Sequence, residues 1–312
     1  MSSDTNLIQA DDIVRVKQST LIELHREAQK IQLKTRSVKA VLSGNYLSAF
    51  KGRGMEFDEA RPYQPGDDIR SIDWRVTART GKTHTKVFRE ERERPVLLWV
   101  DYRRSMFFGT QNYFKSVLAA KTAALLAWST VQHGDRLGGL IFSENLHQEL
   151  RPQRGKAAAL HFIKKLSQHP AWDDYQQTSH DEISGAQALR RLRRVARPGS
   201  LIFLISDFRY LDSSAESSLA RLSRHNDVVM LFINDPLEAQ LPPAGFYRVS
   251  DGENEVNLNT RNTKNRDEYA YRFQQHEQTF RDLSNKLGMY FLNIATDMPL
   301  VSHLQKGLGL KK

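Results

Sequence analysis

The sequence contains no cysteine, which excludes disulfides, thiolate metal sites and cysteine nucleophiles. No apolar run approaches the ~20 residues that span a bilayer. The polar and acidic N-terminal residues 1–12 lack the basic and apolar regions of a signal peptide. The 10 histidines form no His-x-x-x-His or His-Glu-x-x-His pair, which disfavours a zinc hydrolase. We therefore expect a cytoplasmic protein without a membrane span.

Motifs for nucleotide and ester chemistry are also missing. There is no Gly-x-x-x-x-Gly-Lys-Ser/Thr loop to hold phosphates. Gly52-x-Gly54 lacks the third glycine, the preceding strand and the following helix of a dinucleotide-binding fingerprint. No Gly-x-Ser-x-Gly elbow is present. Because no complete catalytic set is visible, we expect a protein that is not an enzyme and needs no cofactor.

The sequence has an excess of positive charge. The 312 residues include 46 basic and 36 acidic side chains, a net charge of +10. Such a surplus favours an acidic partner, such as nucleic acid, anionic lipid or an acidic protein. Part of it is local, in the basic run Arg190, Arg191, Arg193, Arg194 and Arg197. A solvated helix face explains this run, and a basic nucleic-acid-binding protein is the alternative function that it leaves open.

The apolar pattern of residues 96–312 predicts a doubly wound, mainly parallel α/β sheet. Continuous apolar runs suit strands that are buried on both faces, and helical stripes alternate with them. The expected strands are 96–100, 137–142, 201–206, 228–233 and 289–294, and the expected helices are 114–132, 156–166, one that begins at 212 or 213, and one over 269–287. The runs 96–100 and 201–206 should be neighbouring central strands. Residues 245–258 predict a β-hairpin inserted on the sheet edge.

The chain divides into three expected segments. Residues 1–43 form an N-terminal helical segment, because residues 7–33 carry helical periodicity. Residues 44–95 form a charged β-rich arm with few large apolar residues, and residues 96–312 form the sandwich. We expect the charges of the arm to pair with one another and with the sandwich, and Trp74 to be buried.

Carboxylates follow three of the expected strands. Asp101, Asp207 and Asp235 each come directly after an apolar run or one residue later. In an open parallel sheet, ligands bind beyond the carboxyl ends of the strands. Asp101 and Asp207 should therefore share a crevice, with the hydroxyl of Ser105 nearby. Oxygen ligands of this kind suit Mg²⁺, whereas capping of the next turn is the structural alternative. A metal-dependent hydrolase is a second alternative function.

The end of the first strand resembles a von Willebrand factor A-type domain. In that family the first strand ends in Asp-x-Ser-x-Ser, a metal-ion-dependent adhesion site. Here the segment is Asp101-Tyr102-Arg103-Arg104-Ser105, so Arg103 replaces the first serine. The resemblance implies a degenerate site in which Asp101, Ser105 and Asp207 would hold the metal. Arg103 would bring a fixed positive charge that pairs with one of the aspartates instead of the ion.

The segment before this strand resembles domain-of-unknown-function family fifty-eight, which is often encoded beside MoxR-type AAA+ ATPases. The motifs are Gly-x-Gly-x-Glu-Phe, Arg-x-Tyr, Gly-Asp-Asp-x-Arg and Ile-Asp-Trp. Their residues, which we assign to interaction, are Arg53, Glu56, Arg61, Tyr63, Gly66, Asp67, Asp68, Arg70, Asp73 and Trp74. The resemblance covers about residues 35–300. It implies a von Willebrand factor A-like protein-binding module that works with a MoxR-type ATPase on a client protein complex, through residues 101–109.

Overall fold

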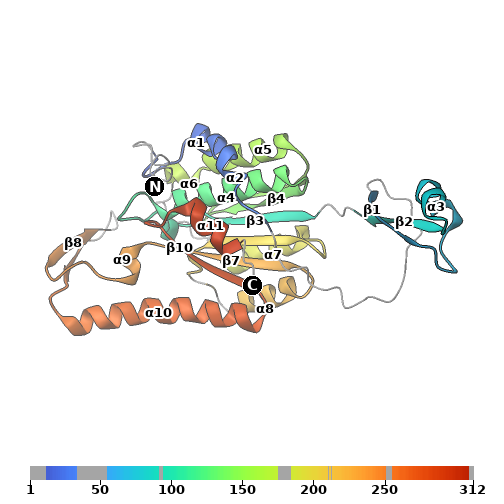
Figure 1. Ribbon diagram of the computed structural model, residues 1–312. Coiled ribbons are helices and arrows are strands. Elements are labelled where there is room, and N and C mark those ends of the chain that lie inside the picture. Colours follow the sequence, from blue (N-terminus) through green and yellow to red (C-terminus); the bar gives the residue numbers. More distant parts are fainter. Residues whose placement is uncertain are drawn as a thin grey trace. The chain divides into compact units, whose positions relative to one another are not determined.

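The computed structural model describes residues 12–33, 55–90, 94–174, 184–209, 211, 213–250 and 255–308. The chain forms two compact units, one of residues 1–39 with 94–312 and one of residues 40–93. Figure 1 labels the helices and strands of both units. Within the described ranges, no helix has the length and apolarity needed to cross a membrane.

A six-stranded sheet forms the centre of the first unit, with the strand order β10-β7-β6-β3-β4-β5. The strands are β3 (Pro95–Asp101), β4 (Arg136–Phe142), β5 (His147–Gln153), β6 (Leu201–Ser206), β7 (Asp227–Asn234) and β10 (Tyr290–Ala295). All neighbours pair in parallel except β4 and β5. The chain builds outward from β3 in one direction and then from β6 in the other, so the order reverses between them. The predicted doubly wound, mainly parallel sheet is confirmed, as are β3 and β6 as neighbours.

Two apolar cores lie on opposite faces of this sheet. Residues of β3 alternate between them, with Val96 and Leu98 in one core and Leu97 and Trp99 in the other. The first core is covered by α1 (Gln18–Glu23), α2 (His25–Ala28), α4 (Lys115–Gln132), α5 (Lys156–Ser167), α6 (Ala171–Asp174) and α11 (Leu300–Leu308). The second is covered by α7 (Gly185–Val195), α8 (Ser213–Ser223) and α10 (Thr263–Lys286). Figure 1 shows these helices on both sides of the strands. Burial on both faces explains the continuous apolar runs.

The N-terminal helices belong to the first unit. The indole Nε1 of Trp128 donates a hydrogen bond to the backbone oxygen of Leu21 at 3.0 Å. The hydroxyl of Ser129 donates to the backbone oxygen of Ile31 at 2.9 Å. The described part of the expected helical segment is thus fastened to α4, which lies about a hundred residues later in the chain.

One hairpin and one edge strand differ from the sequence prediction. The hairpin of β8 (Phe246–Ser250) and β9 (Glu255–Asn259) is antiparallel as predicted, but it forms its own two-stranded sheet and does not extend the main one. Strand β5 was not predicted, because Leu150 is its only buried residue. An edge strand that faces water on most of its length carries no continuous apolar run.

The second unit is the described arm. Strands β1 (Met55–Pro62) and β2 (His84–Glu90) pair in antiparallel register, and the turn between them holds the 3-10 helix η2 (Ile69–Ser71) and the helix α3 (Trp74–Thr80). The expected burial of Trp74 is wrong, since its side chain is 68% exposed. Neither apolar core includes a described residue of the arm. Among the described residues, none of the arm's side chains belongs to a core that could cover the indole.

Candidate functional site

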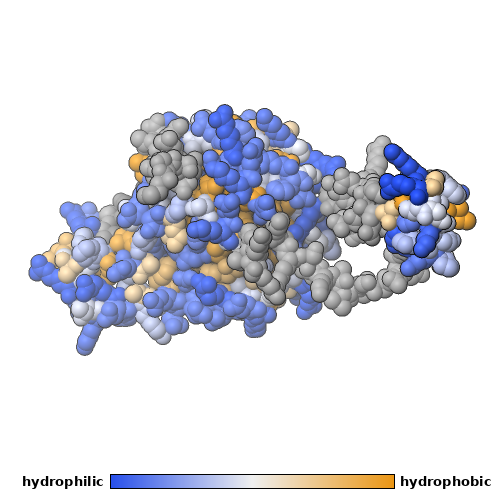
Figure 2. Space-filling model, in the orientation of Figure 1, coloured by the Kyte–Doolittle hydropathy of each residue, from blue (hydrophilic) through white to orange (hydrophobic). Residues whose placement is uncertain are grey.

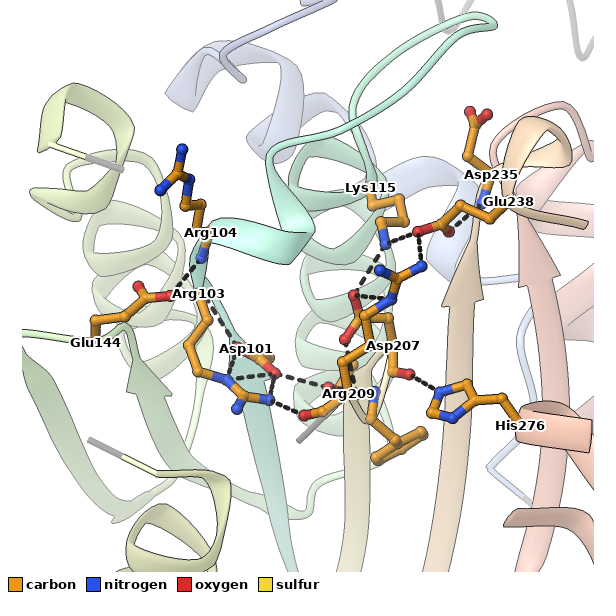
Figure 3. A network of polar contacts seen from close by, with 12 residues as sticks. Asp101, Arg103, Arg104, Lys115, Glu144, Asp207, Arg209, Asp235, Glu238 and His276 are labelled. Carbon is orange, nitrogen blue, oxygen red and sulfur yellow. Dashed lines mark hydrogen bonds and ion pairs between the residues drawn. The ribbon is translucent and has the colours of Figure 1, made fainter. Parts of the chain in front are cut away.

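A buried polar network occupies the end of the sheet where β3 and β6 finish (Figure 3). Asp101 is the last residue of β3, and Asp207 directly follows β6. Both carboxylates are buried. Because these strands are parallel neighbours, their ends bring the two side chains to the same edge. This is the place where doubly wound sheets bind ligands.

Asp101 is held by four donors. The backbone N–H of Arg103 donates to its Oδ1 at 2.9 Å, and the Nε and Nη2 of the same arginine donate to Oδ1 at 3.0 Å and to Oδ2 at 2.6 Å. The hydroxyl of Ser206 donates to Oδ2 at 2.7 Å. The guanidinium is only 6% exposed and also donates to the backbone oxygen of Arg209 at 3.1 Å. The ion pair that the sequence predicted between Arg103 and Asp101 is present.

Burial works to lower the pKa of Arg103, but the carboxylate of Asp101 outweighs it and raises the pKa above the ordinary value. The guanidinium therefore keeps its charge at every physiological pH. A fixed cation at this position compensates the charge of Asp101 without help from solvent or an ion.

Asp207 is paired with a second cation that the sequence did not suggest. The Nζ of Lys115, the first residue of α4, donates to Asp207 Oδ2 at 2.9 Å and to Glu238 Oε1 at 2.7 Å. The Nη2 of Arg209 also donates to Glu238 Oε1 at 2.8 Å. Burial by itself raises the pKa of Asp207, but the charge and hydrogen bond of Lys115 hold it below the usual range. Two buried carboxylates thus share one buried ammonium group.

Asp235, at the end of β7, organises the surrounding loops. It accepts hydrogen bonds from the backbone N–H and the hydroxyl of Thr110 and from the hydroxyl of Thr296. Its own N–H donates to Glu238 Oε2 at 3.0 Å, which completes a capping box at the start of α9 (Pro236–Ala239). Burial works to raise the pKa of Asp235, and the bonds from Thr110 and Thr296 lower it overall. The network therefore continues from Asp207 to the loop before α4.

This donor set does not fit Mg²⁺. The oxygens of Asp101 are engaged by Arg103 and Ser206, and those of Asp207 by Lys115 and by the N–H of Arg209. Two side-chain cations already supply the compensating charge that a divalent ion would bring. Within the described ranges, no group of three His, Asp or Glu side chains is arranged to hold a metal.

Ser105, the third predicted ligand, lies in the 3-10 helix η3 (Arg104–Met106) that follows β3. Its hydroxyl oxygen is buried and has no hydrogen-bond partner among the described residues. The next residue back, Arg104, donates its backbone N–H to Glu144 at 2.6 Å. Figure 3 shows the side chain of Arg104 directed away from Asp101. The start of η3 is thus tied to Glu144, and the hydroxyl of Ser105 stays inside the protein.

Two hollows open beside the network. One of about 290 Å³ is lined by Arg209, Glu238, Tyr269, Arg272, Phe273 and His276. In it, the Nε2 of His276 forms a hydrogen bond of 2.9 Å with the backbone oxygen of Asp207. The other, of about 1030 Å³, is lined by residues 110 and 111, by residues 236, 237 and 239–243 of α9 and the segment after it, and by four residues of α10. We call the larger one the α9–α10 groove. Its lining combines polar and apolar side chains.

The family-motif residues lie in the arm, where four of the described ones hold the local structure. Arg61 pairs with Asp67 at 2.7 Å, and Asp67 also accepts the N–H of Gln64. Asp68 caps η2, and Asp73 caps α3 by accepting the N–H groups of the next residues. The remaining motif residues are Tyr63 and Gly66 in the turn after β1, Arg70 and Trp74 with exposed side chains, Glu56 on β1 with a side chain outside the described part, and Arg53 outside the described residues altogether.

Comparison with known proteins places the chain among others of unknown role. The sequence model of a family described as "Protein of unknown function DUF58" matches residues 59–279. Uncharacterized proteins of Mycobacterium bovis and Mycobacterium tuberculosis are 32% identical over 226 residues, which cover 71% of this chain and 68% of theirs. The solved structure of a conserved hypothetical protein BatB from Bacteroides thetaiotaomicron matches with 16% identity and a TM-score of 0.45, over 69% of this chain and 97% of that one. A von Willebrand factor type A protein from Catenulispora acidiphila matches with 12% identity and a TM-score of 0.39, over 72% and 43%.

Proposed function

The chain belongs to the DUF58 family of proteins of unknown function, and we propose that it is a non-enzymatic protein-interaction module. The observation that carries this proposal is the closed network at the end of the sheet. Asp101, Asp207 and Glu238 each have a cationic partner within the protein. Because these carboxylates are paired within the protein, the network fixes the shape of the adjoining loops. None of the three carboxylates needs a substrate to balance its charge.

General acid–base catalysis needs a group that gains and loses a proton near the working pH. The pKa values of Asp207 and Asp235 are lowered, and that of Arg103 is raised. These groups therefore keep their charges near neutral pH. Such a set suits a rigid recognition surface better than a proton-transfer site.

The partner that we propose is a MoxR-type AAA+ ATPase, with the pair acting on a client protein complex. The family resemblance of the sequence supports this choice of partner, and the surface supports the mode of binding. The loop after β3 and the α9–α10 groove present polar and apolar groups together. That mixture is typical of surfaces that bind another protein reversibly.

The test uses the full chain and the MoxR-type ATPase encoded in the same genome, with affinity measured by calorimetry. Gln111 and Gln240 are exposed and line the groove, so the double substitution Gln111→Arg and Gln240→Arg should weaken binding by about tenfold or more. Gln187→Arg, at an exposed position on α7, is the matched control and should bind as the wild type does. Absence of binding by the wild-type chain, or equal binding by all three proteins, would contradict the proposal.

A second function, nucleic-acid binding, is favoured by one observation on α7. Arg190, Arg193, Arg194 and Arg197 are exposed, and the sequence has no acidic residue between positions 184 and 206. Guanidinium groups bind phosphates in a bidentate fashion. If this function is correct, affinity for a DNA duplex of about 20 base pairs should fall steeply with salt, and changing the four arginines to glutamine should flatten that dependence. Fluorescence anisotropy at several salt concentrations measures both.

A further inference from the structure

The arm carries an exposed patch that the proposed function does not use. Its members are two apolar side chains, Ile69 and Trp74, and three arginines, Arg70, Arg75 and Arg79; we call it the Trp74 patch. Ile69 and Trp74 are each 68% exposed. Figure 2 shows apolar surface on the arm next to strongly hydrophilic residues. An exposed tryptophan beside arginines has the composition of a binding hot spot.

The local structure holds the patch in a defined shape. Asp73 is buried and accepts the N–H groups of Arg75 and Val76, which fixes the start of α3. The hydroxyl of Thr77 accepts the N–H of His84 at 3.0 Å and so ties α3 to β2. Arg75 and Arg79 are four residues apart and so lie on the same side of α3, and Trp74, Arg75 and Arg79 are all exposed. The indole is therefore presented on a capped helix that is already ordered.

The acidic and the basic side chains of the arm have different roles. The carboxylates of Asp67, Asp68 and Asp73 accept backbone N–H groups within the arm. The side chains of Arg70, Arg75 and Arg79 make no ion pair with any described residue, and all three are exposed. The acidic groups thus build the arm, and the basic groups remain available to a partner. Between positions 69 and 79 the arm thus exposes two apolar side chains and three arginines that are unpaired among the described residues.

We propose that the Trp74 patch docks onto a protein surface in which carboxylates surround an apolar pocket. The indole of Trp74 would enter the pocket with Ile69, and Arg75 and Arg79 would pair with the carboxylates. Burying an aromatic side chain supplies most of the affinity in such contacts, and desolvated arginine pairs supply specificity. The inference rests on the proposed function, because it takes the partner to be the same ATPase and adds a second contact on it.

A protein fits this patch better than a nucleic acid does. Ile69 is aliphatic and cannot stack on a base, yet it is as exposed as Trp74. Asp68 is also exposed beside it and would repel phosphates. A nucleic-acid platform uses aromatic side chains in a uniformly positive groove. An aliphatic group and a carboxylate within the patch favour an apolar pocket with mixed polar groups around it.

The experiment measures the affinity of the full chain for the ATPase of the proposed function by calorimetry. Trp74→Ala, and separately Arg75→Glu with Arg79→Glu, should each weaken binding by at least about tenfold. The pair Arg75→Lys with Arg79→Lys keeps the charge and should lose less affinity. Tyr271→Ala removes an aromatic side chain that is 59% exposed on α10 and should bind as the wild type does. Circular dichroism reports whether each variant keeps its fold.

The outcomes separate this inference from the proposed function. If the wild type binds and the Trp74 patch variants bind equally well, the patch is not a docking surface, although the proposed function stands. If the groove substitutions at Gln111 and Gln240 weaken binding but the patch variants do not, the partner contacts the sandwich alone. If the wild type does not bind the ATPase, both proposals fall. If the patch variants lose affinity only for duplex DNA, the patch serves nucleic acid and the inference is wrong.

Discussion

Arg103 and Asp101 form a buried ion pair in which the guanidinium contacts both carboxylate oxygens, at 3.0 Å and 2.6 Å. The two residues are separated by only one position in the chain. A pair formed so locally does not depend on distant loops for its geometry. It occupies both carboxylate oxygens at the end of β3.

The first prediction concerns the energy of this pair. Asp101→Asn leaves the guanidinium of Arg103 buried without a counter-charge, so the free energy of unfolding should fall by about 3–5 kcal/mol. Urea denaturation at pH 7 measures the change. The double variant Asp101→Leu with Arg103→Met removes both charges and should lose less stability than the single variant. A double variant that is less stable than the single one would show that the charge pair is not the origin of the effect.

Metal binding provides the second prediction. Calorimetric titration of the wild type with Mg²⁺ should give no binding heat, because Arg103 and Lys115 already neutralise the carboxylates. Arg103→Ser removes the guanidinium and restores a hydroxyl at that position. The variant should show a binding heat for Mg²⁺ that the wild type lacks. Wild-type binding as tight as that of the variant would mean that the guanidinium does not exclude the ion.

The third prediction follows the pKa of Asp207. Its folded pKa lies below the unfolded value of 3.8, so its contribution to stability is present above that value and is lost as the pH falls below it. Lys115→Met leaves burial without compensation, so the pKa should rise and the variant should be about 3–5 kcal/mol less stable at pH 7. The difference between the proteins should shrink as the pH falls toward 3.

Urea denaturation at pH 7, 5 and 3 follows this difference. Lys156→Met is the control, because Lys156 is exposed on α5 and its replacement should change stability by less than about 0.5 kcal/mol. A constant difference between wild type and Lys115→Met at all three pH values would indicate lost packing and not lost charge pairing.

The fourth prediction concerns His169, which is fully buried and packs edge-on against Tyr102. Burial lowers its pKa from 6.5 to about 4, and its Nδ1 accepts the N–H of Ala171 at 3.2 Å. In the unfolded chain the imidazole of His169 is therefore protonated below about pH 6.5, whereas in the folded chain it stays neutral down to about pH 4. Stability should fall by about 3 kcal/mol across this window.

Thermal unfolding followed at several pH values between 7 and 4 tests the effect. His169→Asn keeps an acceptor for the N–H of Ala171 and removes the titrating ring. The variant should lose most of the pH dependence between 6.5 and 4, even if it is less stable overall. An unchanged slope in the variant would assign the acid sensitivity to other groups.

The central strands of the first unit were predictable because a strand that is buried on both faces has a continuous apolar run in the sequence. The predicted strand 201–206 coincides with β6 at both ends, and all of its residues are buried. Edge strand β5 has no such run, since most of its side chains face water. The local pair of Arg103 and Asp101 was predictable for a similar reason, because both members lie in one short motif.

The second half of the site was not predictable in this way. Lys115 meets Asp207 and Glu238 across 92 and 123 positions of the chain, and no local pattern encodes such a contact. Two weaker signals existed. Lys115 stands at the start of a largely apolar helix, and Asp235 and Glu238 have the spacing of a capping box. Together they mark charged groups at the edge where the strands end.

The prediction that Trp74 is buried was wrong for a different reason. A large aromatic residue in a short polar segment is usually buried, and the sequence alone gives no measure of the apolar surface available to cover it. Both apolar cores are built by the first unit, and neither includes a described residue of the arm. Exposure of Trp74 is thus a property of the whole unit and not of its neighbours in sequence.

The hydrogen bonds from Trp128 and Ser129 to the N-terminal segment determine when that segment can dock during synthesis, because α4 must be made first. Helices α1 and α2 emerge from the ribosome long before α4, with the entire arm translated in between. At about 5–20 residues per second, the intervening stretch of roughly 90 residues takes about 5–20 s to make. During that time the apolar side of α1 and α2 has no docking surface. The arm has a complete set of strands by then, so it is the first part of the chain able to fold.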